Sequence, residues 1–360
     1  MSASHPRLTH IDALKVLAAQ AIVLHHLVSY GPIARAAQTV MPQLAQGLHD
    51  HGRLAVQVFL VIGGYLSARG LSPRGGALVE ALPRLLWRRY LRLALPFMAA
   101  VLLTLIASAL VAPWLPELVP ETVDLRQLLS HGLLLHGVLG HESLTAGAWY
   151  VAIDFQLFAT LALLLAGARA LPAPWRRVAG PALVTALMLA SAWLFNRVSG
   201  LDHLALYFFA AYGLGALVHW LGLWRHGRGA GLLIFLMLAG ALAVDFRSRL
   251  ALAVATAAVL SVAQARPWQL PAAWAEALSR ASQRSYALFL LHFPVLLIAN
   301  GWLAANYGPD AVGMAGVAMA TAWWAANRLA QPFHRWVELP AGRFDPLRGL
   351  GGRPAGYGRA

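Results

Sequence analysis

Apolar residues run through this chain in long stretches, separated by short segments that contain Arg, Pro and Gly. Ten stretches have about the 17 to 25 residues that a helix needs to cross the hydrocarbon core of a membrane. They are residues 11–30, 54–70, 91–113, 147–169, 178–196, 203–222, 230–245, 249–265, 285–304 and 311–330. Because backbone groups inside a bilayer must bond to one another, continuous apolar stretches of this length predict helices. The alternating pattern of a membrane β-strand is excluded.

The composition supports an all-α, polytopic membrane protein. Of the 360 residues, 59% are hydrophobic and 12% are charged, and the mean hydropathy is +0.61. Soluble domains average about 45 to 50% apolar and about 25% charged residues. We expect a membrane domain over residues 1–340 and a Gly- and Arg-rich cytoplasmic tail over residues 341–360. The chain contains no cysteine, which excludes disulfides and thiolate chemistry.

Basic residues are spread between the apolar stretches and favour one side of the membrane. The formal net charge is +14, but no basic domain collects it, so nucleic acid is not an expected partner. Alternate connecting segments, including both termini, hold 21 of the 28 Lys and Arg residues; the others hold 6, and Lys15 lies inside the first stretch. Cytoplasmic segments carry the basic excess. Both termini are therefore predicted to be cytoplasmic, and residues 114–146 exterior.

The first stretch contains four ionisable side chains: Asp12, Lys15, His25 and His26. Such groups cost about 2.5 to 3.5 kcal/mol each at the centre of a spanning helix, so each is a candidate functional residue. On a helix, Lys15 and His26 share one face about 16 Å apart, and Asp12 can pair with Lys15. His25 points about 80° away from His26. The alternatives are an interfacial ion pair for Asp12 and Lys15, and contacts between helices for the histidines.

The second stretch contains a pair of glycines, and a basic segment precedes the third stretch. Gly63 and Gly64 would let a second backbone or a ligand approach the second stretch closely, and helix packing explains them equally well. A basic and aromatic segment leads into the third stretch. Its arginines are Arg84, Arg88, Arg89 and Arg92, with Trp87 and Tyr90 among them. Guanidinium groups bind phosphate through paired hydrogen bonds, which predicts a nucleotide cofactor site; an anchor on anionic lipid is the alternative.

Polar residues also occur in the fourth and ninth stretches and after the last. Asp154 lies about 10 Å from the start of the fourth stretch, a depth comparable with about 6 Å for His26, so its carboxylate could orient the imidazole. Bonding between helices is the alternative for Asp154. His292 lies mid-membrane beside Pro294, where a structural and a catalytic role are both open. Further candidates are Trp149, Tyr150, Gln156, Tyr286 and Glu338.

Six segments, in order, resemble motifs of the acyltransferase 3 family of bacterial integral membrane O-acyltransferases. They are the set Asp12, Lys15 and His26; Val58–Leu66; Arg84–Pro96; Trp149–Gln156; Ser285–Pro294; and Val337–Pro340. Three positions differ from the family pattern. Lys15 replaces Arg and lacks its planar fork, Asp154 replaces Glu and is one methylene shorter, and Gly63 replaces Ser.

The resemblance implies ten spanning helices in a bacterial inner membrane and transfer of an acetyl or other short acyl group. The donor would be cytoplasmic acyl-coenzyme A, and the acceptor a hydroxyl of a sugar, a glycan or a lipid-linked intermediate. His26, oriented by Asp154, would act as general base or relay the acyl group. Lys15 and the four arginines would hold the donor phosphates, and no metal would be required.

Two other functions fit parts of the sequence. A proton-coupled transporter or flippase for a glycolipid or small anion would use the same histidines and acids as a proton relay, although its two interrupted helices are not obvious here. A metal site could form from histidines expected outside the membrane, but their spacings fit no standard zinc pattern. These histidines are His49, His51, His131, His136 and His141.

The charge distribution makes the topology testable. Reporter fusions after Arg74 and in the tail should report a cytoplasmic position, and a fusion after Glu121 an exterior one, because the basic excess holds the first two segments inside. The opposite pattern of reporter signals would reverse the orientation.

Overall fold

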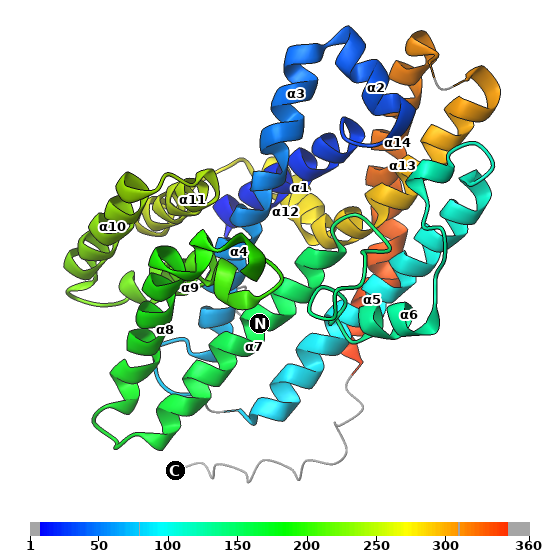
Figure 1. The fold of residues 1–360 in the computed structure, drawn as a ribbon. Coiled ribbons are helices and arrows are strands. Elements are labelled where there is room, and N and C mark those ends of the chain that lie inside the picture. The colour runs from blue at the N-terminus through cyan, green and yellow to red at the C-terminus, as the bar shows by residue number, and fades with distance from the viewer. Residues whose placement is uncertain (1–7, 79, 309, 345–360) are drawn as a thin grey trace.

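The computed structural model describes residues 8–344, apart from residues 79 and 309, and every regular element in this part is a helix (Figure 1). Seven of its helical segments are long and apolar enough to cross a membrane. They are Pro42–Leu71, which joins α3 (Pro42–His51) to α4 (Val56–Leu71); α5 (Leu82–Val111); Ala148–Ala170, which contains α7 (Ala148–Gly167); Val178–Arg197, which contains most of α8 (Arg176–Trp193); α10 (Gly227–Val244); α11 (Ser248–Ala265); and α13 (Ser285–Tyr307). The all-α membrane fold is confirmed.

The other three predicted stretches are also helical, each with a departure. The first divides into α1 (Thr9–Leu27) and α2 (Gly31–Val40), which meet at 93° and together are long and apolar enough for one span. The sixth is α9 (Ala205–Leu221), an apolar helix of only 17 residues. The tenth is α14 (Val312–Phe333), which has the length but not the hydropathy of the seven. Ten crossings therefore remain a prediction.

Residues 112–147 fold back along α5 instead of projecting away from it. Their helix α6 (Leu125–Gly132) begins at Asp124, whose carboxylate accepts a hydrogen bond from the Gln127 amide. Tyr90 of α5 donates to the Gly132 carbonyl at 2.8 Å. This segment is consequently part of the packed structure and is available to form a wall of the site.

The chain ends with surface helices. Helix α12 (Ala272–Gln283) precedes α13, and a π-helical turn (His334–Glu338) joins α14 to α15 (Leu339–Arg343). The predicted boundary at residue 340 falls inside α15. The rest of the predicted tail, residues 345–360, lies outside the described residues, as does Arg7.

Helix α9 is buried over almost its whole length and packs tightly on α4. A Cβ atom on Gly64 would lie 1.8 Å from the Tyr212 carbonyl oxygen, and one on Gly215 would lie 1.9 Å from the Val61 carbonyl oxygen. The two backbones are therefore in direct contact, an approach that only glycine permits. This assigns Gly64 to helix packing, one of the two roles predicted for it.

The arrangement of the helices places the polar side chains at the centre. Helices α10 and α11 form one edge beside α8 and α9, while α2 and α3 arch together at one end (Figure 1). Between these parts, α1 packs on α13 and α4, and α5 packs on α13 and α7. The ionisable residues of the first, third, fourth and ninth predicted stretches thus come from helices that meet.

Candidate active site

A cavity of about 680 Å³ lies among α1, α4, α5, α7 and α13. His26 is in its lining, and Trp149, Tyr150 and Gln156 line it from α7. Connecting segments also line it, including residues 117–120, residues 142–146 and Asp202. All of these segments belong to the set that the charge distribution predicts to be exterior. His26 therefore shares a cavity with segments that are predicted to lie on the outer side.

The His26 imidazole is held by two groups on the same ring nitrogen. Its Nδ1 lies 2.9 Å from the Ile22 carbonyl oxygen and 3.0 Å from Nε2 of His292. A carbonyl oxygen can only accept, so in the neutral ring Nδ1 carries the proton and donates. Nε2 of His26 then has the lone pair, and it has no hydrogen bond to the described part of the chain. This arrangement suits a general base.

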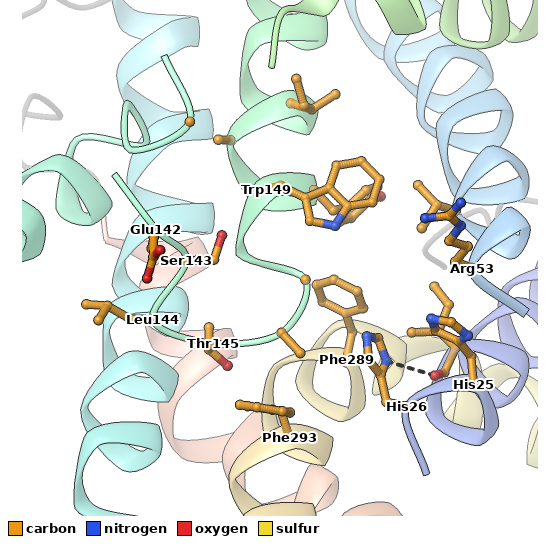
Figure 2. Close-up of a pocket in the computed structure, with 18 of the residues that line it drawn as sticks. His25, His26, Arg53, Glu142, Ser143, Leu144, Thr145, Trp149, Phe289 and Phe293 are labelled. Atoms are coloured by element: carbon orange, nitrogen blue, oxygen red, sulfur yellow. Dashed lines mark hydrogen bonds between the residues drawn. The ribbon is translucent and has the colours of Figure 1, made fainter. Parts of the chain in front are cut away.

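Two further rings fix the position of His26. Tyr30 stacks on it with 5.6 Å between ring centroids and 15° between planes. His25 meets it edge-on at 4.9 Å, and Nδ1 of His25 lies 3.1 Å from the Leu48 carbonyl oxygen. Although helix geometry turns His25 away from His26, both side chains line the cavity because it is wide enough to reach both faces of α1. Figure 2 shows His26 between His25 and Phe289.

Residues that the sequence did not single out complete the cavity. Phe289 and Phe293 of α13 contribute aromatic surface near His26, and Phe208 stacks at 5.6 Å on Trp149, a predicted candidate. Arg53 lies near His25, and the wall that carries Glu142 faces them from the opposite side (Figure 2). Phe289 lies one turn before His292, and Phe293 directly follows it. Their spacing from this predicted site histidine could have identified both as candidates. The two charged residues lie on connecting segments with no periodic pattern.

The sequence predicted that Asp154 orients His26, but in the structure Asp154 has a different partner. Its carboxylate forms a 2.5 Å ion pair with Arg89, in which the side chains are 7% and 21% exposed. The Arg89 guanidinium also lies over the Phe158 ring at 5.1 Å. Asp154 lies at a depth along α7 similar to that of His26 along α1. Its side chain, however, points toward α5 and not toward α1. The partner of His26 is the second imidazole, His292.

The four arginines predicted to bind phosphate have different surroundings. Arg88 is exposed and pairs with Glu80 at 2.9 Å, and Arg89 is committed to Asp154. Arg84 is half-buried in the first turn of α5. Arg92 is exposed and lies within electrostatic range of Lys15 and Glu338. Of the four arginines, Arg89 therefore has a structural role in the buried ion pair, which the other three do not share.

A second polar group lies at the other end of α1. Lys15 is near Asp12, Glu338 and Arg92, and Glu338 accepts a hydrogen bond or forms an ion pair with His334 at 2.7 Å. Tyr286 donates to the Leu93 carbonyl at 3.0 Å, and its hydroxyl is in range of Arg92 as well. These residues lie on the predicted cytoplasmic side. The shared face of α1 thus connects two polar regions, one at each end.

The histidines of the 112–147 segment serve its packing. His131 and His136 are fully buried and stack at 4.2 Å with 10° between their planes. Nδ1 of His131 lies 2.8 Å from the Gln127 carbonyl oxygen, and its Nε2 accepts from the Leu144 amide. Burial, with the neighbouring imidazoles of His131 and His141, lowers the pKa of His136 to about 4. Both nitrogens of His131 are engaged, which leaves it no position for a metal.

Comparison with known proteins identifies the family of this chain. A family model described as an acyltransferase domain, acyltransferase 3, matches residues 8–327. No curated protein and no solved structure gives a significant match. The fold and the family model define a multi-pass membrane acyltransferase. The chain belongs to the acyltransferase 3 family. The transporter alternative expected two interrupted helices, and the described residues contain one bent pair.

The buried ion pair can be tested by its effect on stability. Arg89→Gln or Asp154→Asn should each lower the free energy of unfolding by about 3 to 5 kcal/mol, because each leaves a charge buried without its partner. Replacing both with apolar residues should recover much of the loss. Thermal unfolding in detergent measures the effect.

Arg88→Gln is the matched control for this test. Its pair with Glu80 is exposed, so the change should cost about 0 to 1 kcal/mol. Equal stability of Arg89→Gln and Arg88→Gln would contradict a structural role for Arg89.

Proposed function

We propose that the protein transfers an acetyl or other short acyl group from cytoplasmic acyl-coenzyme A to a hydroxyl of a sugar, glycan or lipid-linked acceptor, in a bacterial inner membrane. The observation that carries the proposal is the position of His26. Its Nε2 lone pair is available at a cavity that predicted exterior segments line, and its helix leads to a basic group at the predicted cytoplasmic end.

His26 would act as the general base. Its Nε2 takes the proton of an acceptor hydroxyl while the hydroxyl oxygen attacks the thioester carbonyl. The C–S bond of the donor then breaks, and the proton passes from His26 to the departing thiolate, so the ring is regenerated. While His26 is protonated, its Nδ1–H still donates to the Ile22 carbonyl and faces Nε2 of His292. The His292 lone pair would stabilise the imidazolium, the role expected earlier for a carboxylate.

The cavity suits a carbohydrate acceptor. Its volume of about 680 Å³ lies within the usual range of about 300 to 1,000 Å³ for ligand sites. Trp149 and Phe289 offer flat apolar surface to a sugar ring, and Glu142 and Gln57 offer hydrogen-bonding groups to its hydroxyls. Aromatic faces beside a few polar groups are typical of sites that orient a polar ring.

The donor would bind at the opposite end of α1. Lys15 and Arg92 supply positive charge for phosphates there, and Lys15 lies about 16 Å from His26 along the helix. Coenzyme A carries its thioester at the end of a long flexible arm. Such a donor fits a site in which the phosphate-binding and catalytic groups are apart.

The catalytic assignment predicts a graded loss of transfer. His26→Ala should lower the rate about 10² to 10⁴ fold, because it removes the base. His292→Ala should cost less, since it removes only the partner of the imidazolium, and His25→Ala should cost least. Transfer from labelled acetyl-coenzyme A is measured in membranes that carry each variant at matched amounts. Wild-type transfer by His26→Ala would refute the assignment, and the transporter alternative requires that no acyl product forms at all.

The donor site predicts changes in KM for acyl-coenzyme A. Lys15→Gln and Arg92→Gln should each raise it about tenfold to a hundredfold, because a charge-assisted hydrogen bond to phosphate contributes about 1.5 to 3 kcal/mol. Arg88→Gln is the control, since Arg88 already pairs with Glu80. An unchanged KM in both test variants would assign these residues to topology alone.

A further inference from the structure

The first span breaks immediately after its catalytic histidine. Helix α1 ends at Leu27, and the chain turns by 93° into α2 at Gly31. A break in a helix leaves backbone amides and carbonyls without their regular partners, and inside a membrane water does not replace them. Local backbone bonds satisfy the Val28 and Ser29 amides, and the remaining groups at this break need partners from other parts of the protein.

Asn300 of α13 supplies those partners. Its side chain is fully buried. Its Oδ1 accepts from the Ile33 amide at 2.9 Å, which is one of the free amides in the first turn of α2. Its Nδ2 donates to the Tyr30 carbonyl at 3.3 Å and to the Leu296 carbonyl of its own helix at 3.1 Å. One side chain thus binds the last residue of the connection between α1 and α2 and the first turn of α2.

Gly31 fits this contact in two ways. Its φ is +74°, in the left-handed region that favours glycine. A Cβ atom at this position would lie 2.7 Å from Oδ1 of Asn300. Any other residue would push Asn300 away from the break.

The contact lies close to the His26–His292 pair on both helices. Tyr30, whose carbonyl Asn300 binds, stacks on the His26 ring and also meets Phe293 edge-on at 5.3 Å. His292 lies on the same helix as Asn300, eight residues earlier, which is about 12 Å along the axis. Asn300 therefore ties the connection that follows α1 to α13, through Tyr30, near the place where the two imidazoles meet.

We infer that Asn300 is a positioning residue, which holds Tyr30 and the start of α2 so that the stacked His26 ring keeps its Nδ1 within hydrogen-bond distance of His292. It does not touch the reactants. The inference rests on the proposed role of His26 as base. Misplacement of a catalytic group by about 1 Å can cost about a hundredfold in rate. Asn300 would act on the rate by this route.

The experiment compares Asn300→Leu with Asn196→Leu. Asn196 is also a buried asparagine, and it also donates to a backbone carbonyl, that of Tyr207 at 2.9 Å, but unlike Asn300 it does not bind the residue that stacks on His26. Membrane vesicles that carry their own envelope glycans are given labelled acetyl-coenzyme A. The rate per folded enzyme is recorded across pH, because an inactive fraction lowers the rate but does not move the pH at which half the activity is lost.

Asn300→Leu should lower the rate about tenfold to a hundredfold and move the acidic limb of the pH–rate profile, because the partner of the His26 proton is displaced. Asn196→Leu should leave that limb in place. Gly31→Ala should move the limb as Asn300→Leu does.

The inference is overturned if Asn300→Leu and Gly31→Ala both leave the acidic limb at its wild-type position, or if Asn196→Leu moves it equally. Failure of the proposed function is a different result. In that case His26→Ala itself keeps wild-type transfer, whatever Asn300→Leu does.

Discussion

The ion pair between Arg89 and Asp154 joins α5 to α7 in the interior, where neither charge is tolerated without the other. The cavity lies on one side of this pair, and the basic group around Lys15 lies on the other. Tyr150 is one turn before Asp154 on α7, lines the cavity and lies in electrostatic range of the pair. On the other side, Arg92 is one turn after Arg89 on α5 and lies within electrostatic range of Lys15. The cavity and the basic group are thus separated by a neutralised layer.

The base has an uncharged partner in this arrangement. A carboxylate beside His26 would favour the protonated imidazole, and only the neutral ring accepts a proton from a hydroxyl. An imidazole partner supplies a lone pair without a net charge. With the negative charge of Asp154 already used by Arg89, His26 and His292 share an uncharged site in which the Ile22 carbonyl keeps the proton on Nδ1 of His26 and Nε2 of His292 offers a lone pair to it.

Helix positions could be predicted from the sequence far better than side-chain partners. All ten apolar stretches are helical, because membrane insertion depends on local hydropathy, and Gly64 lies at a close helix contact as glycine pairs often do. The pairing of Asp154 could not be predicted, because depth along a helix is read from the sequence but the direction of a side chain depends on the neighbouring helices. His292 was named without its partner for the same reason. Asn300 showed no signal, since the break that it satisfies interrupts a continuous apolar run.

The burial of α9 has a consequence for how the protein is assembled. A helix covered by protein on nearly every side cannot reach its final position by insertion into lipid alone. Synthesis runs from the amino terminus, so α4, α7 and α8 have already been made when α9 follows, and these three helices contact it. The glycine contact between α4 and α9 can then form before α10 and α11 are added. The order of the helices along the chain thus matches the order in which they can pack. The central helices can assemble before α10 and α11 are added at the edge.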